Sequence, residues 1–249
     1  MTRRFYVERI AADHGAVTLE GALAQRIAKV LRLRAGDEVV LFDGGGDDVR
    51  VRLDQVGPRG VSGRVVERVA GPPEPHVKVH LYQSITKGER FAWLLEKGTE
   101  IGVARFVPLI AARAVVRPGA GSPKAGRWRR IVAEAAEQCG RSAVPAVEAP
   151  QRFDDALASA PGVLVLPYES ADEGERNMRA ALDGEIDALF ALGAVSIFIG
   201  PEGGFEPAEV ERAKEAGASI VTLGRRVLRS ETAGLVAATL ALHATGELG

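Results

Sequence analysis

Two glycine-containing segments have the residue types and spacing of ligand-binding loops. Residues 197–205 read IFIGPEGGF, and residues 223–233 read LGRRVLRSETA. In each segment, an apolar run typical of a buried strand ends at a glycine and is followed by charged residues. Open α/β folds bind ligands at the carboxyl ends of their strands. Together the segments therefore predict a backbone-lined pocket with charged side chains at its rim.

Glycine would let the first segment approach a ligand closely. Gly200, Gly203 and Gly204 can adopt positive φ, and they carry no Cβ that would keep the backbone away from a bound molecule. The spacing fits neither the P-loop G-x-x-x-x-G-K-[ST] nor the dinucleotide fingerprint G-x-G-x-x-G. A glycine turn after a strand is often only a turn. The RRVLRSE run of the second segment favours a binding site over a plain connection.

Charged residues at helical spacing are candidates for acid–base chemistry. Lys97 and Glu100 lie three residues apart, which places them on one helix face, and Glu137 lies in an AEAAEQCGR helix. Solvated ion pairs have the same spacing, so both interpretations stay open for these residues. Arg229 and Glu231 follow the second glycine segment directly, which favours a functional role for them.

Hydrophobic patterning predicts an α/β protein in two parts. Residues 1–70 are β-rich, with alternation at 37–42, 49–53 and 60–67 and a helix over 22–31, and they predict a small barrel. The GPPEP stretch at 71–75 predicts a linker, because proline interrupts both helices and strands. From residue 76 to 249, strands alternate with helices, which is typical of a parallel sheet.

The larger part has these expected elements: strands at 78–83, 105–110, 162–166, 195–199 and 219–223, and helices at 90–101, 126–139, near 175–182, 207–216 and 232–244. Pro207 suits the first position of its helix. Thr232 is expected to cap the last helix.

Composition narrows the class of protein. The chain has 249 residues, of which 46% are hydrophobic, and a single cysteine, Cys139, so a disulfide framework is excluded. We expect Cys139 to be a small buried residue. No signal peptide and no run of about 18 apolar residues is evident, which predicts a soluble protein of the cytoplasm. The four histidines lack metal-ligand spacing, and no metal is expected.

Charge is distributed unevenly although the net charge is only −1. Residues 1–70 carry 12 Lys/Arg against 10 Asp/Glu, residues 71–160 carry 13 against 9, and residues 161–249 carry 7 against 14. The first two parts are therefore mildly basic and the last is acidic. This asymmetry fits a protein that holds RNA with one part and a small cofactor with another.

Five motifs in the same order resemble one known family. Besides the two glycine segments taken together, they are RFYV at 4–7, VLRLRAGDEVVLFD at 30–43, KGTEIGVARFV at 97–107 and RRIVAEAAEQCGRSAVP at 129–145. This pattern is similar to the RsmE family of small-subunit rRNA uridine-N3 methyltransferases, in the SPOUT superfamily. The resemblance spans essentially the whole chain.

The resemblance implies a fold and an activity. Residues 1–70 would form a PUA-like RNA-binding barrel, and residues 76–249 a SPOUT methyltransferase domain with a carboxyl-terminal trefoil knot. The cofactor would be S-adenosylmethionine, the substrate 16S rRNA in the small ribosomal subunit, and the active form a homodimer. A SPOUT methyltransferase that acts on tRNA or on a ribose 2′-hydroxyl is the alternative. A non-enzymatic RNA-binding protein would leave the second glycine segment without a purpose.

The resemblance also implies site residues. Cofactor binding falls to Leu166, Pro167, Ile199, Gly200, Pro201, Glu202, Gly203, Gly204, Leu223, Gly224, Val227, Leu228 and Arg229. RNA binding falls to Arg4, Lys29, Arg32, Arg34, Lys97, Gln138 and Arg141. The catalytic candidates are Arg229, Glu231, Glu100 and Glu137. Arg229 would stabilise the charge that develops on the uracil oxygens, whereas the general base stays open among the three glutamates and bulk water.

Some positions depart from the family pattern. The helix before VLR commonly carries a histidine in the family, but here it reads AQRIAK at 24–29. Glu206 stands where the family has serine or threonine, and its carboxylate can cap the following helix equally well. The stretch Pro167, Tyr168 and Glu169 leaves the contacts of that loop open.

The last expected helix indicates that the chain forms a dimer. Its sequence, TAGLVAATLALHA, is apolar nearly all round, so the helix must be buried on more than one side. A sheet face covers only one side. We therefore expect a two-fold partner to cover the rest.

Overall fold

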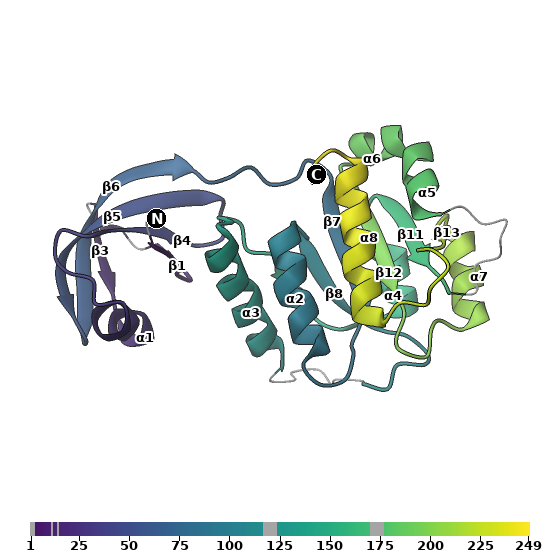
Figure 1. Ribbon diagram of the computed structural model, residues 1–249, viewed down its shortest axis with the longest axis horizontal. Coiled ribbons are helices and arrows are strands. Elements are labelled where there is room, and N and C mark those ends of the chain that lie inside the picture. Colours follow the sequence, from purple (N-terminus) through teal and green to yellow (C-terminus); the bar gives the residue numbers. More distant parts are fainter. Residues whose placement is uncertain (1–2, 11, 14, 117–123, 170–176) are drawn as a thin grey trace. The chain divides into compact units, whose positions relative to one another are not determined.

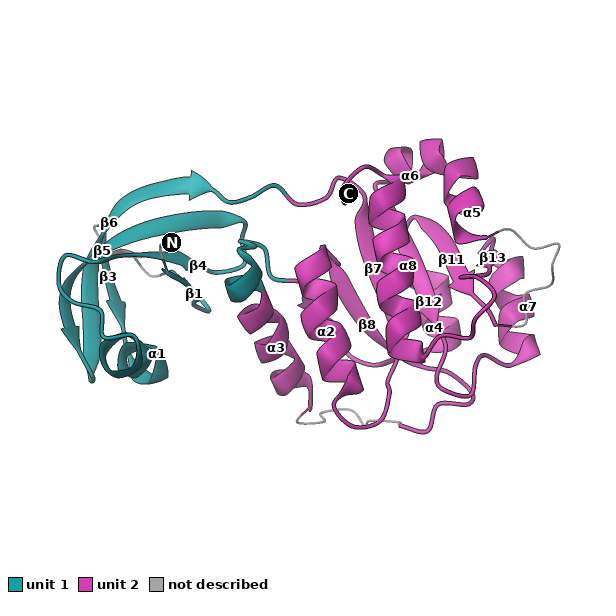
Figure 2. Ribbon diagram, in the orientation of Figure 1, with its two compact units in different colours: residues 1–73, 136–144 teal, residues 74–135, 145–249 magenta. Residues whose placement is uncertain are grey.

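The computed structural model describes residues 3–10, 12–13, 15–116, 124–169 and 177–249. The chain forms two compact units (Figure 2). Unit 1 comprises Met1–Pro73 and Ala136–Val144, and unit 2 comprises Glu74–Ala135 and Pro145–Gly249. The division at Pro73 falls within the GPPEP stretch, and the end of one long helix belongs to unit 1.

Unit 1 is a mixed β-sheet with a short helical segment. Its strands pair in the order β1-β4-β5-β6-β3-β2, with β1 and β4 parallel and the other pairs antiparallel. The strands are β1 (Arg3–Tyr6), β2 (Ala12–Asp13), β3 (Ala16–Leu19), β4 (Glu38–Phe42), β5 (Asp47–Gly57) and β6 (Gly60–Ala70). Alternate residues such as Val49, Val51 and Leu53 point into the core, which explains the alternation in the sequence.

The helix expected at 22–31 forms, with a change of winding halfway. It consists of α1 (Gly21–Gln25) followed by a π-helical turn, η1 (Arg26–Val30). The amide of Leu31 donates to the carbonyl of Arg26 at 2.9 Å, which is the wider spacing of a π turn. Ala24 and Ile27 pack into the core of the sheet. The chain then leaves the turn through Arg32, whose φ of 53° is positive.

Unit 2 is an α/β layer structure on a parallel sheet (Figure 1). The strand order is β10-β8-β7-β12-β11-β13, and β9 also pairs with β8. These strands are β7 (Lys78–Ser84), β8 (Arg105–Ile110), β9 (Ala146–Val147), β10 (Gln151–Arg152), β11 (Val163–Pro167), β12 (Ala194–Ile199) and β13 (Ser219–Val221). Each crossover between parallel strands requires a longer connection, and helices supply most of them.

Helices cover both faces of this sheet. The helix α8 (Ser230–Ala244) lies against β7 and β12 and packs on α2 (Arg90–Ile101) and α5 (Met178–Gly184). The other face buries α4 (Phe153–Ser159) and α7 (Pro207–Glu215) against a cluster that contains Tyr82 and Phe198. The rings of Tyr82 and Phe198 stack at 4.5 Å. Also present are α3 (Lys124–Cys139) and α6 (Ile186–Leu192).

The strand order creates a topological switch point between β7 and β12. These two strands pair along six residues, yet the chain leaves β7 towards β8 and reaches β12 from β11, on the opposite side. In open α/β sheets, ligands bind outside the carboxyl ends of strands at such a point. The carboxyl ends of β11, β12 and β13 lie on the same edge because the strands are parallel.

The α/β class and most expected elements of unit 2 are confirmed, with some differences. The strand expected at 219–223 ends at Val221, and the short helices α4 and α6 were not predicted. Residues 175–176 of one expected helix lie outside the described residues.

Two smaller expectations were wrong. Cys139 is exposed, not buried, because it lies on the outer side of the last turn of α3. Thr232 does not cap α8, because the helix already begins at Ser230.

No helix among the described residues is long and apolar enough to cross a membrane.

The half-buried His80 predicts a pH dependence of stability. Burial, and secondly the charge of Arg105, lower the pKa of His80 to about 4. Unfolded histidine titrates near 6.5, so between about pH 6.5 and 4 the unfolded chain binds a proton that the folded chain does not. The free energy of unfolding should therefore fall as the pH drops through this window. Replacing His80 with threonine should make this slope shallower, as measured by urea unfolding at a series of pH values.

The exposed His76 provides the control for this experiment. His76→Gln should keep the wild-type slope. Equal slopes in wild type and His80→Thr would show that His80 does not contribute.

Candidate functional site

A cavity of about 470 Å³ lies at the carboxyl edge of the sheet in unit 2. This volume is within the usual range for small-molecule sites. Three loops form most of its wall, after β11, β12 and β13. The wall residues are Arg90, Pro167, Tyr168, Glu169, Ile199, Gly200, Pro201, Glu202, Gly204, Phe205, Thr222, Leu223, Gly224, Arg225, Arg226, Val227, Leu228, Arg229, Ser230 and Ala233.

The loop after β12 needs its glycines to form this wall. The strand β12 is buried along its whole length and delivers Gly200 to the pocket. A Cβ at Gly200 would lie 3.2 Å from the ring of Phe205. Gly204 has a φ of 67°, and a Cβ there would overlap the carboxylate of Glu169. The positive φ of Gly204 therefore favours glycine, and at Gly200 a larger residue would have to push against the ring of Phe205.

A buried glutamate fixes the end of the same loop. Glu209, only 2% exposed, accepts hydrogen bonds from the amides of Glu206 and Ala112, both at 2.9 Å. The side chain of Glu206 caps α7 in return, as expected for a carboxylate at this position. The loop after β12 is therefore anchored both to α7 and to the segment that follows β8.

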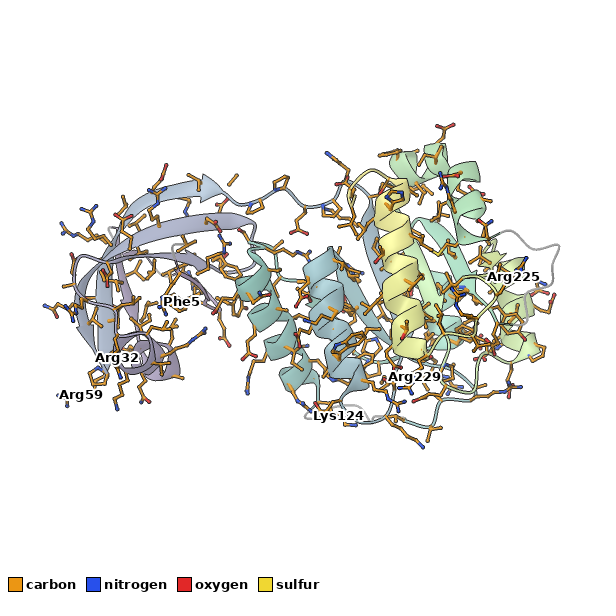
Figure 3. The ribbon with its side chains drawn as sticks, in the orientation of Figure 1. Phe5, Arg32, Arg59, Lys124, Arg225 and Arg229 are labelled. Atoms are coloured by element: carbon orange, nitrogen blue, oxygen red, sulfur yellow. The ribbon has the colours of Figure 1, made fainter. Side chains whose placement is uncertain are left out.

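The loop after β13 carries most of the positive charge of the site. The hydroxyl of Thr222 accepts from the amide of Gly224 at 3.1 Å, and Gly224 has a φ of 113°. Arg225 and Arg226 are exposed, and Val227 is 82% exposed. Figure 3 labels Arg225 and also Arg229, which immediately precedes α8. The sequence predicts charged side chains at the rim of the pocket, and on this loop those side chains are arginines.

Ser230 ties the two glycine loops to the centre of the sheet. Its hydroxyl accepts from Nε2 of Gln83 at 2.8 Å and donates to the carbonyl of Gly200 at 2.5 Å. Gln83 lies near the carboxyl end of β7 and is 1% exposed. This bridge was not visible in the sequence, because its three residues are far apart along the chain.

A group of three charged residues lies beside the cavity. Arg90, at the start of α2, approaches Glu202 and Glu231 with nitrogen-to-oxygen distances of 3.7 Å each. Glu231 is nearly buried, with a side chain 8% exposed. Its neighbours Ser230 and Arg229 line the cavity. The sequence analysis did not single out Arg90, although Arg90 begins the helix that follows the first strand of the parallel sheet, and this position was a usable signal.

Most residues expected to bind a cofactor lie on the cavity wall. The exceptions are Leu166 and Gly203. Leu166 is fully buried in the cluster that contains Tyr82 and Phe198. The carbonyl of Gly203 accepts from Arg113 at 3.0 Å, and its Cα faces that side chain. The wall also contains residues outside that set: Arg90, Tyr168, Glu169, Phe205, Thr222, Arg225, Arg226, Ser230 and Ala233.

Lys97 and Glu100, both candidate site residues, bind each other. The ammonium group of Lys97 lies 2.8 Å from Glu100 and 2.8 Å from Glu96. These two carboxylates raise the pKa of Lys97, Glu100 contributing first. The pair therefore has the geometry of a partly exposed helix ion pair, and neither residue is on the cavity wall.

Glu137, another candidate, is engaged within unit 1. Its carboxylate lies 2.8 Å from the guanidinium of Arg26 and accepts from the amide of Tyr6 at 3.2 Å. The guanidinium of Arg26 also lies over the ring of Phe5, 5.4 Å from its centre. Glu137 thus attaches the end of α3 to the sheet of unit 1. Gln138 next to it is exposed, and Arg141 is half-buried.

Arg4, an RNA-binding candidate, is also held inside unit 1. Its guanidinium donates to both carboxylate oxygens of Asp48, at 2.5 and 2.8 Å, and to the hydroxyl of Ser142 at 2.9 Å. Burial opposes ionisation of Asp48, but the hydrogen bonds from Arg4 and Ser142 outweigh it and lower the pKa of this carboxyl. By contrast Lys29, Arg32 and Arg34 are exposed around η1 (Figure 3 labels Arg32).

No group of histidine, cysteine, aspartate or glutamate side chains in the described part of the chain could hold a metal ion.

Comparisons with known proteins identify the family. The RNA methyltransferase domain family matches residues 72–242, and the RNA methyltransferase PUA domain family matches residues 27–66. Ribosomal RNA small subunit methyltransferase E of Bacillus subtilis is 34% identical over 225 residues, which cover 88% of this chain and 87% of that protein.

Solved structures agree over almost the whole chain. A methyltransferase from Legionella pneumophila in complex with the cofactor SAM is 29% identical, with a TM-score of 0.84 and 98% of each chain covered. Ribosomal RNA small subunit methyltransferase E from Neisseria gonorrhoeae, bound to S-adenosyl methionine, is 30% identical, with a TM-score of 0.81 and the same coverage. The chain therefore belongs to the RsmE family, the SPOUT-type ribosomal RNA small subunit methyltransferases E, in which a PUA domain accompanies the methyltransferase domain.

Proposed function

We propose that this protein is an S-adenosylmethionine-dependent methyltransferase that methylates N3 of a uridine in 16S rRNA. The observation that carries the proposal is the glycine-lined cavity at the switch point, with its cationic rim. Two solved structures similar to this chain are complexes with S-adenosylmethionine, which supports the proposed cofactor. The same cavity could serve a methyltransferase for tRNA or for a ribose hydroxyl, so the product decides between these activities.

The cavity has the chemistry that the cofactor needs. Gly200 and Gly204 have no side chains, and a Cβ at either position would crowd the loop. Without side chains in the way, the backbone amides and carbonyls of this loop would be able to face the edge of an adenine ring. Ile199, Leu223 and Leu228 supply apolar surface for the ring. When bound, S-adenosylmethionine supplies a methyl group on a positively charged sulfur. The surrounding loops would hold it bent, beside the threaded chain of a trefoil knot.

Methylation at N3 requires groups that stabilise negative charge on the uracil oxygens, and the rim of the cavity has such groups. N3 of uracil carries a proton and lies between two carbonyl groups, so losing the proton places negative charge on both oxygens. Arg229, on the wall and exposed, would donate to such an oxygen. Of the two candidate bases in unit 2, Glu231 adjoins the cavity, whereas Glu100 is bound to Lys97.

Unit 1 would hold the RNA as a PUA-like barrel. Lys29, Arg32 and Arg34 are exposed on and just after the π-helical turn, and their side chains make no ion pair with the described residues. Such cations suit phosphate contacts, which position an RNA without selecting a base. Arg4 is already bound to Asp48, so we rest the RNA contact on the other three.

The helix α8 would form the centre of a homodimer. Ala237, Ala238 and Ala241 are buried, whereas Leu235, Val236 and Leu240 remain partly exposed although apolar. A partner helix related by two-fold symmetry would cover these side chains through an isologous interface.

Arg229→Ala should lower the rate of methyl transfer by about 10²–10³, the usual loss for one donor to a developing oxyanion. Lysine at this position should restore less than full activity, because it lacks the planar fork of arginine. The measurement is single-turnover transfer to small ribosomal subunits that carry unmodified 16S rRNA, with calorimetry to follow cofactor binding. Mass spectrometry should identify 3-methyluridine, and a 2′-O-methylated or 5-methylated product would refute the proposed activity.

Replacing both Arg32 and Arg34 with alanine should weaken RNA binding, because two phosphate contacts are lost. The magnitude of the slope of the logarithm of the binding constant against the logarithm of salt concentration should fall by roughly 1 to 2. Cofactor affinity should not change. The matched control is Arg52→Ala with Arg64→Ala, since these guanidiniums already pair with Glu38 and Asp54. If both double variants have the wild-type slope, unit 1 does not bind RNA through this turn.

Light scattering should give about twice the chain mass of 26.3 kDa. Leu235→Asp with Leu240→Asp should produce an inactive monomer, because burying two carboxylates in the interface is costly. Leu192→Asp on α6, at a side chain that is 60% exposed, is the control and should remain dimeric. A wild-type monomer that methylates rRNA would exclude the dimer.

A further inference from the structure

Arg90 reaches the cavity from outside the glycine loops. It begins α2, in the connection that follows the carboxyl end of β7. Because β7 pairs with β12, this connection lies next to the loop that contains Gly200, and the amide of Lys87 donates to Glu202 at 3.4 Å. Arg90 therefore lines the cavity from the β7 side of the switch point, where ligands bind in open α/β sheets.

Two carboxylates hold the guanidinium of Arg90 without occupying its donors. Nη1 lies 3.7 Å from Glu202, and Nε lies 3.7 Å from Glu231. Both distances exceed those of hydrogen bonds, and the guanidinium of Arg90 makes no hydrogen bond to any described residue. Its side chain is 46% exposed. The N–H groups of a planar fork are thus left available for an acceptor that enters the cavity.

Glu231 is placed to orient this arginine. It is the second residue of α8, and the preceding Ser230 is fixed by Gln83 and Gly200. One carboxylate oxygen of Glu231 faces Arg90, and the other is buried without a hydrogen-bond partner among the described residues. A buried carboxylate needs a countercharge, and Arg90 supplies it. Taking a proton onto Glu231 would break this ion pair.

We propose that Arg90 is a second catalytic arginine, which donates to one carbonyl oxygen of the target uracil while Arg229 serves the other, and that Glu231 positions Arg90. The inference rests on the proposed uridine N3 activity. In the step, the N3 proton passes to water, the N3 electron pair forms the bond to the methyl carbon, and the carbon–sulfur bond breaks with its electrons remaining on sulfur. The imide anion shares its charge between two oxygens on opposite sides of N3, which matches two arginines from separate segments.

The test is the pH dependence of single-turnover methyl transfer by Arg90→Ala, with small ribosomal subunits that carry unmodified 16S rRNA. The rate at pH 7 should fall by about 10²–10³. Much of the loss should be recovered at alkaline pH, where uridine loses its N3 proton without help from the enzyme. S-adenosylmethionine affinity should stay within about twofold, and Arg90→Lys should retain part of the activity. Arg179→Ala, at an exposed ion pair on α5, is the control and should match wild type.

Other results would overturn the assignment in recognisable ways. A loss of cofactor affinity that accounts for the whole rate change would mean that Arg90 binds the cofactor carboxylate. A raised KM for the subunit with unchanged kcat and a smaller salt slope would mean that it binds a phosphate. A uniform rate loss at every pH would exclude imide stabilisation. Failure of the wild-type enzyme to produce 3-methyluridine would instead reject the proposed function itself.

A double-mutant cycle tests the role of Glu231. Glu231→Gln alone should slow the reaction, but it should cost little more in the Arg90→Ala background, because Glu231 acts through Arg90. If Glu231 were instead a base that acts independently of Arg90, the rate loss of the double variant would be the product of the losses of the two single variants. Multiplied losses would therefore restore Glu231 as a candidate base and refute its positioning role. Thermal unfolding of each variant shows whether the chain is folded.

Discussion

The hydroxyl of Ser230 is the interaction on which the cavity depends. It joins the end of β7, the loop after β12 and the start of α8 through two hydrogen bonds to Gln83 and Gly200. Gln83 is buried, and leaving its amide without this partner costs about 1–3 kcal/mol. Gly234, one turn further along α8, permits this contact, because a Cβ there would overlap the amide of Gln83. The same bridge places Glu231, and with it the ion pair to Arg90.

Local patterns in the sequence were sufficient for much of the fold. The β12 run and the α2 periodicity are strong because each element buries a continuous apolar surface, and both elements form close to the expected bounds. The short helices α4 and α6 could not be predicted, since seven residues give too few turns for a periodic signal. The π-helical turn after α1 packs Ile27 into the core of the sheet, and no local pattern in the sequence distinguishes such a turn from an α-helix.

Part of the candidate site could likewise be predicted from local sequence, and part of it could not. The two glycine loops were recognisable because each follows its own strand, so local sequence places them at the sheet edge. Arg90 and Gln83 join them only through the pairing of β7 with β12, which are more than a hundred residues apart. Spacing also could not reveal that Glu137 binds Arg26, or that Arg4 binds Asp48, because these partners come from distant strands and helices of unit 1.

The net charge of this chain says little about its binding partner, because many of its arginines form ion pairs with nearby carboxylates. Several on the sheet of unit 1 pair across neighbouring strands: Arg50 with Glu67, Arg52 with Glu38, Arg64 with Asp54 and Arg68 with Asp47. Exposed pairs of this kind contribute little to stability, but they cancel charge. Arg32 and Arg34 just after the π-helical turn, and Arg229 at the cavity, have no such partner among the described residues. Positive charge therefore remains uncompensated at the two places where an RNA backbone and a uracil anion would need it.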